Sequence, residues 1–496
     1  MESSFIKELK QRSTETQTQN GDKAYNTTKS CCLDLFASAG VLRGSEERTI
    51  LSYWEKAYKE DPILAVEILF YIRSVREGYG ERRVFRVIWN SLDKLLQETL
   101  WNLVPVVGRW DDLEETILNN FVISEDIYSQ LLTDYEKAQK GGEVTLLAKW
   151  LPCGRGNKGV KKRTKKMAQR FNLKEQDYRA IVTSIRKRLN LVESKMAKKE
   201  WREVDYSLIP SRAGFVHSKA FLRNDPERYT AFMLSRDTNK NMSNLTPTEI
   251  LSKYGTIRVD NDLAEIYNVM WNNLPDYLDG SSAIAVMDLS ASMTWTNLYK
   301  SSVEPLDASL AMGIYFSERN KGAFKNLAIS FSTTPRVYSF NEGDTIWQKR
   351  AFVLNKDSTG GSTNLRAVFN LLLNIAIKNN SPQEDLPKSI FIFSDMQFDK
   401  GVDTNSSTFE DAKAEYERAG YKLPRVVFWN LAADPNTYPV QSGEKGTVLV
   451  SGYSTKLFTS ILKGDYEYSP EEQMKETIRE FSCCEEIAKR LQDLSL

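Results

Sequence analysis

The sequence is poor in the residues that many catalytic and metal sites require, above all histidine. His217 is the single histidine in 496 residues, which excludes zinc sites built from several histidines and catalytic arrangements that use two. A Ser-His-Asp triad would have to use His217, and no Gly-x-Ser-x-Gly nucleophile motif stands out. No Gly-x-x-x-x-Gly-Lys-Ser/Thr phosphate-binding loop is present either. We therefore expect a protein that is not an enzyme.

Cysteine and long apolar runs are also scarce. The five cysteines occur as Cys31-Cys32, Cys153 and Cys483-Cys484, a poor disulfide framework because adjacent cysteines rarely bridge each other. No apolar run approaches about 18 residues, so we expect no membrane span. The first residues lack the basic head and apolar core of a secretory signal. These features together predict a protein of the reducing cytoplasm.

The composition is otherwise that of an ordinary globular protein. The chain is 41% hydrophobic and 27% charged, with a net charge of +1. This balance excludes neither nucleic acid nor protein partners, because the local distribution of charge matters more than the sum. The length exceeds what one core usually supports, so we expect a multidomain protein.

The C-terminal part, residues 276–496, shows apolar strands that alternate with helical segments. This order predicts an α/β domain with a doubly wound, Rossmann-like parallel sheet, whose ligands lie beyond the carboxyl ends of the strands. Buried strands end at Asp288 and Asp395, and Thr363 follows a Gly-Gly loop. With Ser290 and Ser292, these side chains offer carboxylate and hydroxyl oxygens, which suit Mg²⁺ or another divalent cation. The alternative is that the two serines only cap the next helix.

The pattern Asp288-x-Ser290-x-Ser292, with Thr363 and Asp395, resembles the metal-ion-dependent adhesion site (MIDAS) of von Willebrand factor A domains. The resemblance implies that Ser290, Ser292 and Thr363 bind the ion directly, and that Asp288 and Asp395 do so directly or through water. It also implies that one coordination position remains for an acidic residue of a partner protein.

The N-terminal half is predicted to be helical. Residues 1–45 begin with a polar stretch that predicts a loosely attached extension. Residues 46–275 show successive helix-period segments with short turns, which predict an all-α helical-repeat domain of the HEAT-like solenoid type. Asp61-Pro62 is one helix start, with Asp as the N-cap and Pro at the first helical position.

Positive charge is concentrated within this helical half. Residues 151–170 hold eight basic residues and no acidic one, and a second cluster follows around Trp201. Such clusters neutralise phosphate backbones, and an aromatic side chain beside them can stack on unpaired bases. The alternative is a solvated basic surface without a ligand. The candidate RNA-binding residues are Arg155, Lys158, Lys161, Lys162, Arg163, Lys165, Lys166, Arg170, Arg186, Lys187, Arg188, Lys198, Lys199 and Trp201.

Several short motifs in a fixed order resemble an uncharacterised family of plants and viruses. They lie at residues 73–82, 147–152, 209–213, 393–396, 427–431 and 450–454. That family couples a helical region to a C-terminal von Willebrand A-like domain. The domain order is similar to that of the Ro ribonucleoprotein (TROVE) proteins, which bind misfolded and small structured RNAs. This second similarity is one of architecture, so it carries RNA binding to this chain only by analogy.

Three functional hypotheses remain open from the sequence. The first is a non-catalytic RNA-binding protein that resembles Ro ribonucleoproteins, with RNA on the basic helical domain and Mg²⁺ in the A-like domain. The second is a protein-interaction scaffold whose metal site binds an acidic residue of a partner. The third is a metal-dependent nuclease or phosphotransferase, which is disfavoured because such enzymes need several carboxylates around two ions.

Overall fold

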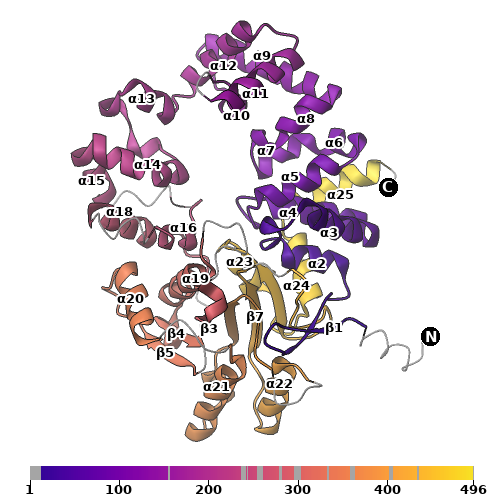
Figure 1. The fold of residues 1–496 in the computed structure, drawn as a ribbon, viewed down its shortest axis with the longest axis vertical. Helices are drawn as coiled ribbons and strands as arrows, with labels where there is room; N and C mark the ends of the chain where they lie inside the picture. The colour runs from indigo at the N-terminus through magenta and orange to yellow at the C-terminus, as the bar shows by residue number, and fades with distance from the viewer. Residues whose placement is uncertain are drawn as a thin grey trace.

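The chain folds into a helical part followed by an α/β part (Figure 1). The computed structural model describes residues 13–154, 157–235, 242, 244–253, 261–278, 282–294, 303–331, 334–357, 363–400, 406–432 and 435–494. This arrangement confirms the expected division into a helical N-terminal region and an α/β C-terminal region. The exact domain boundaries at residues 46 and 276 stay predictions.

The helical part is an arc of short helices that pack mainly on their neighbours in sequence. As predicted, Asp61 caps one of them, since its carboxylate accepts a hydrogen bond of 3.0 Å from the amide of Leu64, and Pro62 follows at the first helical position. The helices are α2 (Cys31–Ser38), α3 (Glu47–Glu60), α4 (Pro62–Arg73), α5 (Arg82–Ser91), α6 (Lys94–Leu100), α7 (Val104–Val107), α8 (Glu114–Asn119), α9 (Phe121–Gln139), α10 (Leu147–Trp150), α11 (Lys158–Arg170), α12 (Glu175–Arg188), α13 (Val192–Lys198), α14 (Ser211–Asn224), α15 (Pro226–Leu234), α16 (Pro247–Leu251) and α18 (Asn261–Asn272).

Residues 13–45, expected to be loosely attached, are instead integrated into the fold. Strands β1 (Glu15–Gln17) and β2 (Lys23–Tyr25) form an antiparallel hairpin. Helix α2 follows and buries Cys32, Leu33 and Leu35 completely. The polar composition of this segment predicts loose attachment. That prediction is wrong because the hairpin is held by hydrogen bonds to residues far away in the sequence, which no local pattern reveals.

The α/β part is a six-stranded sheet in the order β5-β4-β3-β6-β7-β8. Its strands are β3 (Ala283–Asp288), β4 (Leu327–Phe331), β5 (Arg336–Ser339), β6 (Ser389–Ser394), β7 (Arg425–Asn430) and β8 (Thr447–Ser451). Every neighbouring pair is parallel except β4 and β5, which are antiparallel. The sheet is therefore mixed rather than wholly parallel. The strand that the sequence did not reveal, β5, is short and mostly exposed at the edge.

Helices cover both faces of the sheet. Phe316 of α19 (Pro305–Arg319) and Phe458 of α23 (Leu457–Lys463) contact Phe391 of β6, with ring centroids 4.7 and 5.6 Å apart. On the opposite face, Phe409 of α22 (Thr408–Arg418) contacts Phe428 of β7 at 6.1 Å. The remaining helices of this part are α20 (Ile346–Lys356), α21 (Leu365–Asn379), α24 (Pro470–Arg479) and α25 (Cys484–Asp493).

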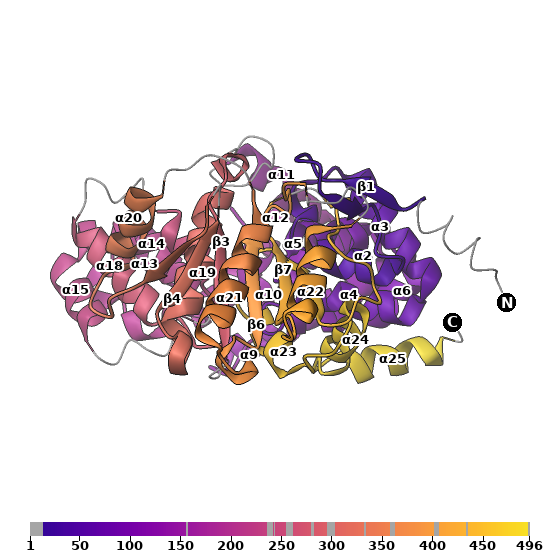
Figure 2. The ribbon, with the colours of Figure 1, turned by 90° about the horizontal axis from the view of Figure 1, so that it is seen from below.

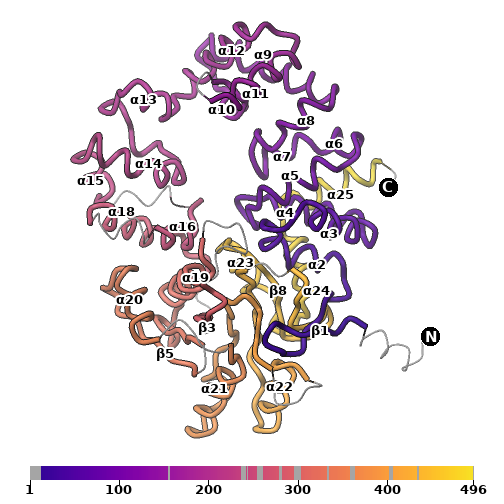
Figure 3. Tube along the Cα trace, in the orientation of Figure 1, coloured from indigo at the N-terminus to yellow at the C-terminus, as the bar shows by residue number. Residues whose placement is uncertain are grey.

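The helical arc meets the α/β part at both of its ends, so the described elements form a closed ring (Figures 1 and 3). At one end, α2 packs against β8 and α24, and α25 packs against α4 and α6. At the other end, α16 packs against α19 and α18 packs against α20. Seen from below, the C-terminal helices α24 and α25 lie along the first helices of the arc (Figure 2).

Candidate functional site

Two acidic residues lie where the neighbouring central strands β3 and β6 end. Asp288 is the last residue of β3, and Asp395 directly follows β6. The two strands pair in parallel, with Met287 beside Phe393. Both acids are buried, with exposed fractions of 0% and 3%. The sheet topology therefore brings together two carboxyl groups that are more than a hundred residues apart in the chain.

The loops that follow these strands hold the carboxylates in place. The Ser290 amide donates to Asp288 Oδ1 at 2.9 Å, and the Ser394 hydroxyl donates to Asp288 Oδ2 at 2.5 Å. The Gln397 amide donates to Asp395 Oδ1 at 3.1 Å. Between them Met396 has a φ of +63°, a left-handed conformation that costs a non-glycine residue roughly 1–2 kcal/mol. A tight turn therefore follows Asp395 directly at the end of β6.

The three predicted hydroxyl ligands lie around the same strand ends. Ser290 Oγ and Ser292 Oγ are 3.1 Å apart, and the Ser292 side chain hydrogen-bonds to Asp395. Thr363, 1% exposed, precedes α21, and its hydroxyl accepts a hydrogen bond of 3.2 Å from the Asn20 amide. That same amide reaches the carbonyl of Gln397, two residues after Asp395. The Gly-Gly loop before Thr363 lies outside the described residues.

The electrostatics of this cluster are unfavourable without a cation. Burial raises the pKa of Asp288 to about 7, and the nearby charge of Asp395 adds to this shift. Burial also raises the pKa of Asp395, although hydrogen bonds from Ser292 and Gln397 oppose the shift. Within the described part of the chain, no arginine or lysine forms an ion pair with either carboxylate. A divalent ion would supply the missing positive charge, and two carboxylates with three hydroxyls are oxygen donors that suit Mg²⁺.

The basic residues of α11 form a stripe along one side of the helix. Lys158, Lys161, Lys162, Lys165 and Lys166 follow helical spacing and are all exposed. The other side buries Thr164, Met167 and Ala168. Within the described part of the chain, these five lysines form no ion pair, whereas the neighbouring Arg163 pairs with Glu114. Arg155 lies outside the described residues.

Most candidate arginines, by contrast, form ion pairs or hydrogen bonds with other residues of the chain. Arg163 binds both carboxylate oxygens of Glu114 at 2.6 Å, and Arg170 donates to the carbonyl of Ile117 at 2.9 Å. Arg186 donates to four backbone carbonyls at and after α10, which fixes that short helix against α12. Arg188 donates to the carbonyls of residues 141 and 142. These four residues therefore have structural partners.

The second basic cluster is more dispersed. Lys187 and Lys199 are exposed, while Lys198 lies 3.5 Å from Glu200. Trp201 is half-buried and contacts Phe221 edge to face, with ring centroids 6.4 Å apart. His217 contacts the same ring at 6.1 Å. Among the candidate residues, the α11 lysines thus form the largest group of exposed positive charges on one helix.

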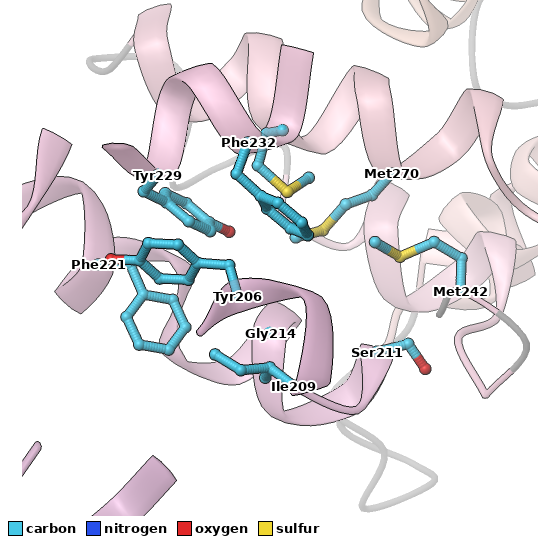
Figure 4. Close-up of a pocket in the computed structure, with 10 residues that line it drawn as sticks. Tyr206, Ile209, Ser211, Gly214, Phe221, Tyr229, Phe232, Met242 and Met270 are labelled. Atoms are coloured by element: carbon cyan, nitrogen blue, oxygen red, sulfur yellow. The ribbon is translucent and has the colours of Figure 1, made fainter. Parts of the chain in front are cut away.

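A separate cavity lies between α14, α15 and α18 (Figure 4). Aromatic and methionine side chains line most of it, and the buried Tyr229 hydroxyl has no hydrogen-bond partner within the described residues. The space holds little more than a water molecule. It is therefore too small to be the main functional site.

Sequence reasoning missed Asn20, Ser394 and Gln397. Asn20 and Gly21 lie in the five-residue connection between β1 and β2, where Gly21 has a φ of +89°, and Asn and Gly are typical turn residues. The position of Asn20 against Thr363 was not predictable, because no local pattern links residues more than 300 positions apart. Ser394 precedes Asp395 at the end of an apolar strand, and its bond to Asp288 depends on the pairing of β3 with β6.

Comparisons with known proteins agree with the two-part organisation. Residues 18–106 and 144–283 match a family model described as a domain of unknown function (DUF2828). The helical part thus matches an uncharacterised family. Residues 282–493 match a second model, also described as a domain of unknown function (DUF7788). Neither description assigns an activity.

A viral relative extends over nearly the whole chain. The uncharacterized protein L728 of Acanthamoeba polyphaga mimivirus is 27% identical over 503 residues, covering 91% of this chain and 85% of the viral protein. Among solved structures, the Ro (RSR) protein of Deinococcus radiodurans is similar with 14% identity and a TM-score of 0.37, covering 97% of this chain and 94% of that one. None of the helices in the described residues is both long and apolar enough to cross a bilayer.

Proposed function

We propose that this chain is a non-catalytic RNA-binding protein in which the helical part binds RNA and the α/β part binds a divalent cation. The α/β part would be a von Willebrand A-like domain, and the helical part a HEAT-like repeat array that resembles the TROVE region of Ro ribonucleoproteins. The observation that carries RNA binding is the stripe of five exposed lysines on α11. Like charges three and four residues apart repel each other, and an RNA backbone would relieve that repulsion.

The cation site is proposed on the donor set at the ends of β3 and β6. Asp288, Ser290, Ser292, Thr363 and Asp395 would hold Mg²⁺, directly or through water. The two buried carboxylates support this assignment because burial and mutual repulsion oppose their ionisation, and a bound cation would reverse both effects. The ion would supply a fixed positive charge at the end of the sheet. We assign it no catalytic step.

The cation site also favours a second candidate function, protein interaction. Mg²⁺ prefers six ligands in octahedral geometry, so five protein side chains leave a position that an acidic residue of a partner protein could fill. In that case the helical ring would be a scaffold, and the lysine stripe would bind an acidic protein surface.

An RNA-binding experiment separates the two candidates. Changing Lys161, Lys162, Lys165 and Lys166 to Gln should weaken binding of a structured RNA at 50 mM salt by at least about tenfold and should flatten the salt dependence of the affinity. The charge-matched control changes four exposed lysines elsewhere, namely Lys56, Lys59, Lys378 and Lys489. Equal loss in both variants would show a non-specific charge effect. Absence of binding by the unmodified chain at low salt would refute RNA binding and leave the scaffold.

A further inference from the structure

The turn of the N-terminal hairpin lies directly beside the loop that carries Asp395. The Thr18 hydroxyl donates to the Phe398 carbonyl at 2.6 Å, and the backbone amide of Gln19 donates to the side-chain oxygen Oε1 of Gln397 at 2.7 Å. Gly21 forms an antiparallel bridge with Asp399. The first described residues of the chain thus extend the surface around the candidate cation site.

Asn20 joins the two loops that hold proposed ligands. Its side-chain amide has two N–H groups, and both are used. One donates to Thr363 Oγ1 at 3.2 Å and the other to the Gln397 carbonyl at 2.7 Å. The Thr363 loop and the Asp395 loop are separate in sequence. The Asp399 amide joins them by donating a hydrogen bond of 3.0 Å to the Thr363 carbonyl, and the Asn20 side chain adds a second link that reaches the Thr363 hydroxyl itself.

The hairpin is anchored independently of Asn20. Buried Asp22 accepts a hydrogen bond of 3.1 Å from the Thr408 amide at the start of α22. Further along, Tyr25 and Tyr438 exchange backbone hydrogen bonds of 2.9 and 2.8 Å. These contacts hold the turn in place, so the amide of Asn20 is positioned before any ligand arrives.

We propose that Asn20 is a positioning residue of the cation site and that docking of the N-terminal hairpin is coupled to cation binding. The inference rests on the cation site of the proposed function. A threonine ligand must present an oxygen lone pair to the ion, and a donor on the same oxygen restricts its rotation. Residues that orient metal ligands in this way typically change metal affinity by about 10–100-fold. Coupling is reciprocal, so the ion should stabilise the docked hairpin by the same factor.

The test is a calorimetric titration of the metal-free full chain with MgCl2. Asn20→Ala should raise the Kd for Mg²⁺ about tenfold. Gln19→Ala is the matched control, because the adjacent Gln19 contacts the loop through its backbone amide, and its Kd should stay within about twofold of the unmodified chain. Asn20 is exposed, so the substitution leaves the core intact.

Two further measurements separate positioning from general stability. In a Thr363→Val background, Asn20→Ala should have a smaller effect than in the unmodified chain, since the hydroxyl it orients is gone and only its hydrogen bond to the Gln397 carbonyl remains. Mg²⁺ should slow hydrogen exchange of residues 14–25 in the unmodified chain and in Gln19→Ala, but not in Asn20→Ala. An unchanged or lower Kd in Asn20→Ala overturns the inference and leaves the cation site standing. A chain that shows no Mg²⁺ binding at all overturns both.

Discussion

At the scale of single residues, the ionisation of Asp288 should make the stability of the metal-free chain depend on pH. It is fully buried, it accepts hydrogen bonds from Ser290 and Ser394, and its carboxylate faces the charge of Asp395. Because the pKa is raised in the folded chain, the unfolded chain ionises this group at lower pH. The metal-free fold therefore loses stability from this group as the pH rises from about 4 to about 7.

Asp288→Asn should stabilise the metal-free chain at pH 8, since the amide keeps the shape of the side chain without the buried charge. A pKa of about 7 against an ordinary value of 3.8 corresponds to at most about 4 kcal/mol. The measurement is the free energy of urea unfolding in EDTA at pH 8, with pH 4 as the internal control, where the gain should vanish. A less stable variant at pH 8 would contradict this electrostatic account. The same variant should lose Mg²⁺ binding.

Magnesium binding itself should depend on pH through Asp288. The ion needs the charged carboxylate, so protons compete with it below the pKa of about 7. We expect the Kd for Mg²⁺ to be about tenfold higher at pH 6 than at pH 8, because about a tenth of Asp288 is ionised at pH 6 and about nine tenths at pH 8. Calorimetry at the two pH values checks this, and a Kd that is the same at both would remove Asp288 from the ligand set.

Residue-level patterns predicted the five proposed ligands but not the groups that orient them. Asp288 and Asp395 end apolar strands, and the parallel order of such strands places their ends together. Asn20 and Ser394 have no such signal, because their roles depend on contacts formed only after the chain has folded. Likewise, the sequence did not show that Arg186 would be used by backbone carbonyls rather than remaining available to phosphate.

At the scale of secondary-structure elements, the lysine stripe of α11 should lower the stability of its own helix, because neighbouring lysines repel each other. Lys162 lies four residues from both Lys158 and Lys166, and three from Lys165. Lys162→Glu would replace these repulsions by attractions, so it should raise the free energy of unfolding by about 0.5–1 kcal/mol. It should also weaken RNA binding. A variant that is more stable but binds RNA more weakly would indicate that the lysines serve RNA binding rather than the stability of the fold.

The control for this prediction is Lys489→Glu in α25. Lys489 follows Glu485 and Glu486 by four and three residues, so the same change of charge creates repulsion and should lower stability slightly. Chemical denaturation of both variants measures the difference. If Lys162→Glu destabilised the chain as Lys489→Glu does, the stripe would not be a source of repulsion.

Elements with strong apolar periodicity were predictable, and short edge elements were not. The apolar runs of β3, β6, β7 and β8 are buried on both faces, which gives the continuous hydrophobic pattern of parallel strands. By contrast, β5 has four residues, of which only Tyr338 is buried. The β1–β2 hairpin has three-residue strands and a polar sequence, so its place in the fold follows from tertiary contacts alone.

At the scale of the whole molecule, ring closure depends on contacts between the two ends of the chain. Ser482 donates through its hydroxyl and its amide to Glu77, at 2.6 and 3.0 Å. Arg490 donates to the Thr99 carbonyl at 2.9 Å and to Asn102 at 2.6 Å. The residues of each pair are between 388 and 405 positions apart in the sequence, which explains why no sequence pattern indicated whether the helical array closes.

The C-terminal helix α25 should therefore control whether the two parts unfold together. Ile487 and Leu491 are completely buried, and α25 packs against α4 and α6. Replacing both with alanine should cost about 2–5 kcal/mol per site. Because that loss weakens the packing of α25 against α4 and α6, which connects the two parts, the calorimetric unfolding of the chain should separate into two transitions, with the helical part unfolding first. Lys489→Ala on the exposed side of the same helix should leave the profile unchanged. A single transition that only shifts to lower temperature would mean that the remaining contacts, of α2 with β8 and α24 and of α16 with α19, suffice to couple the two parts.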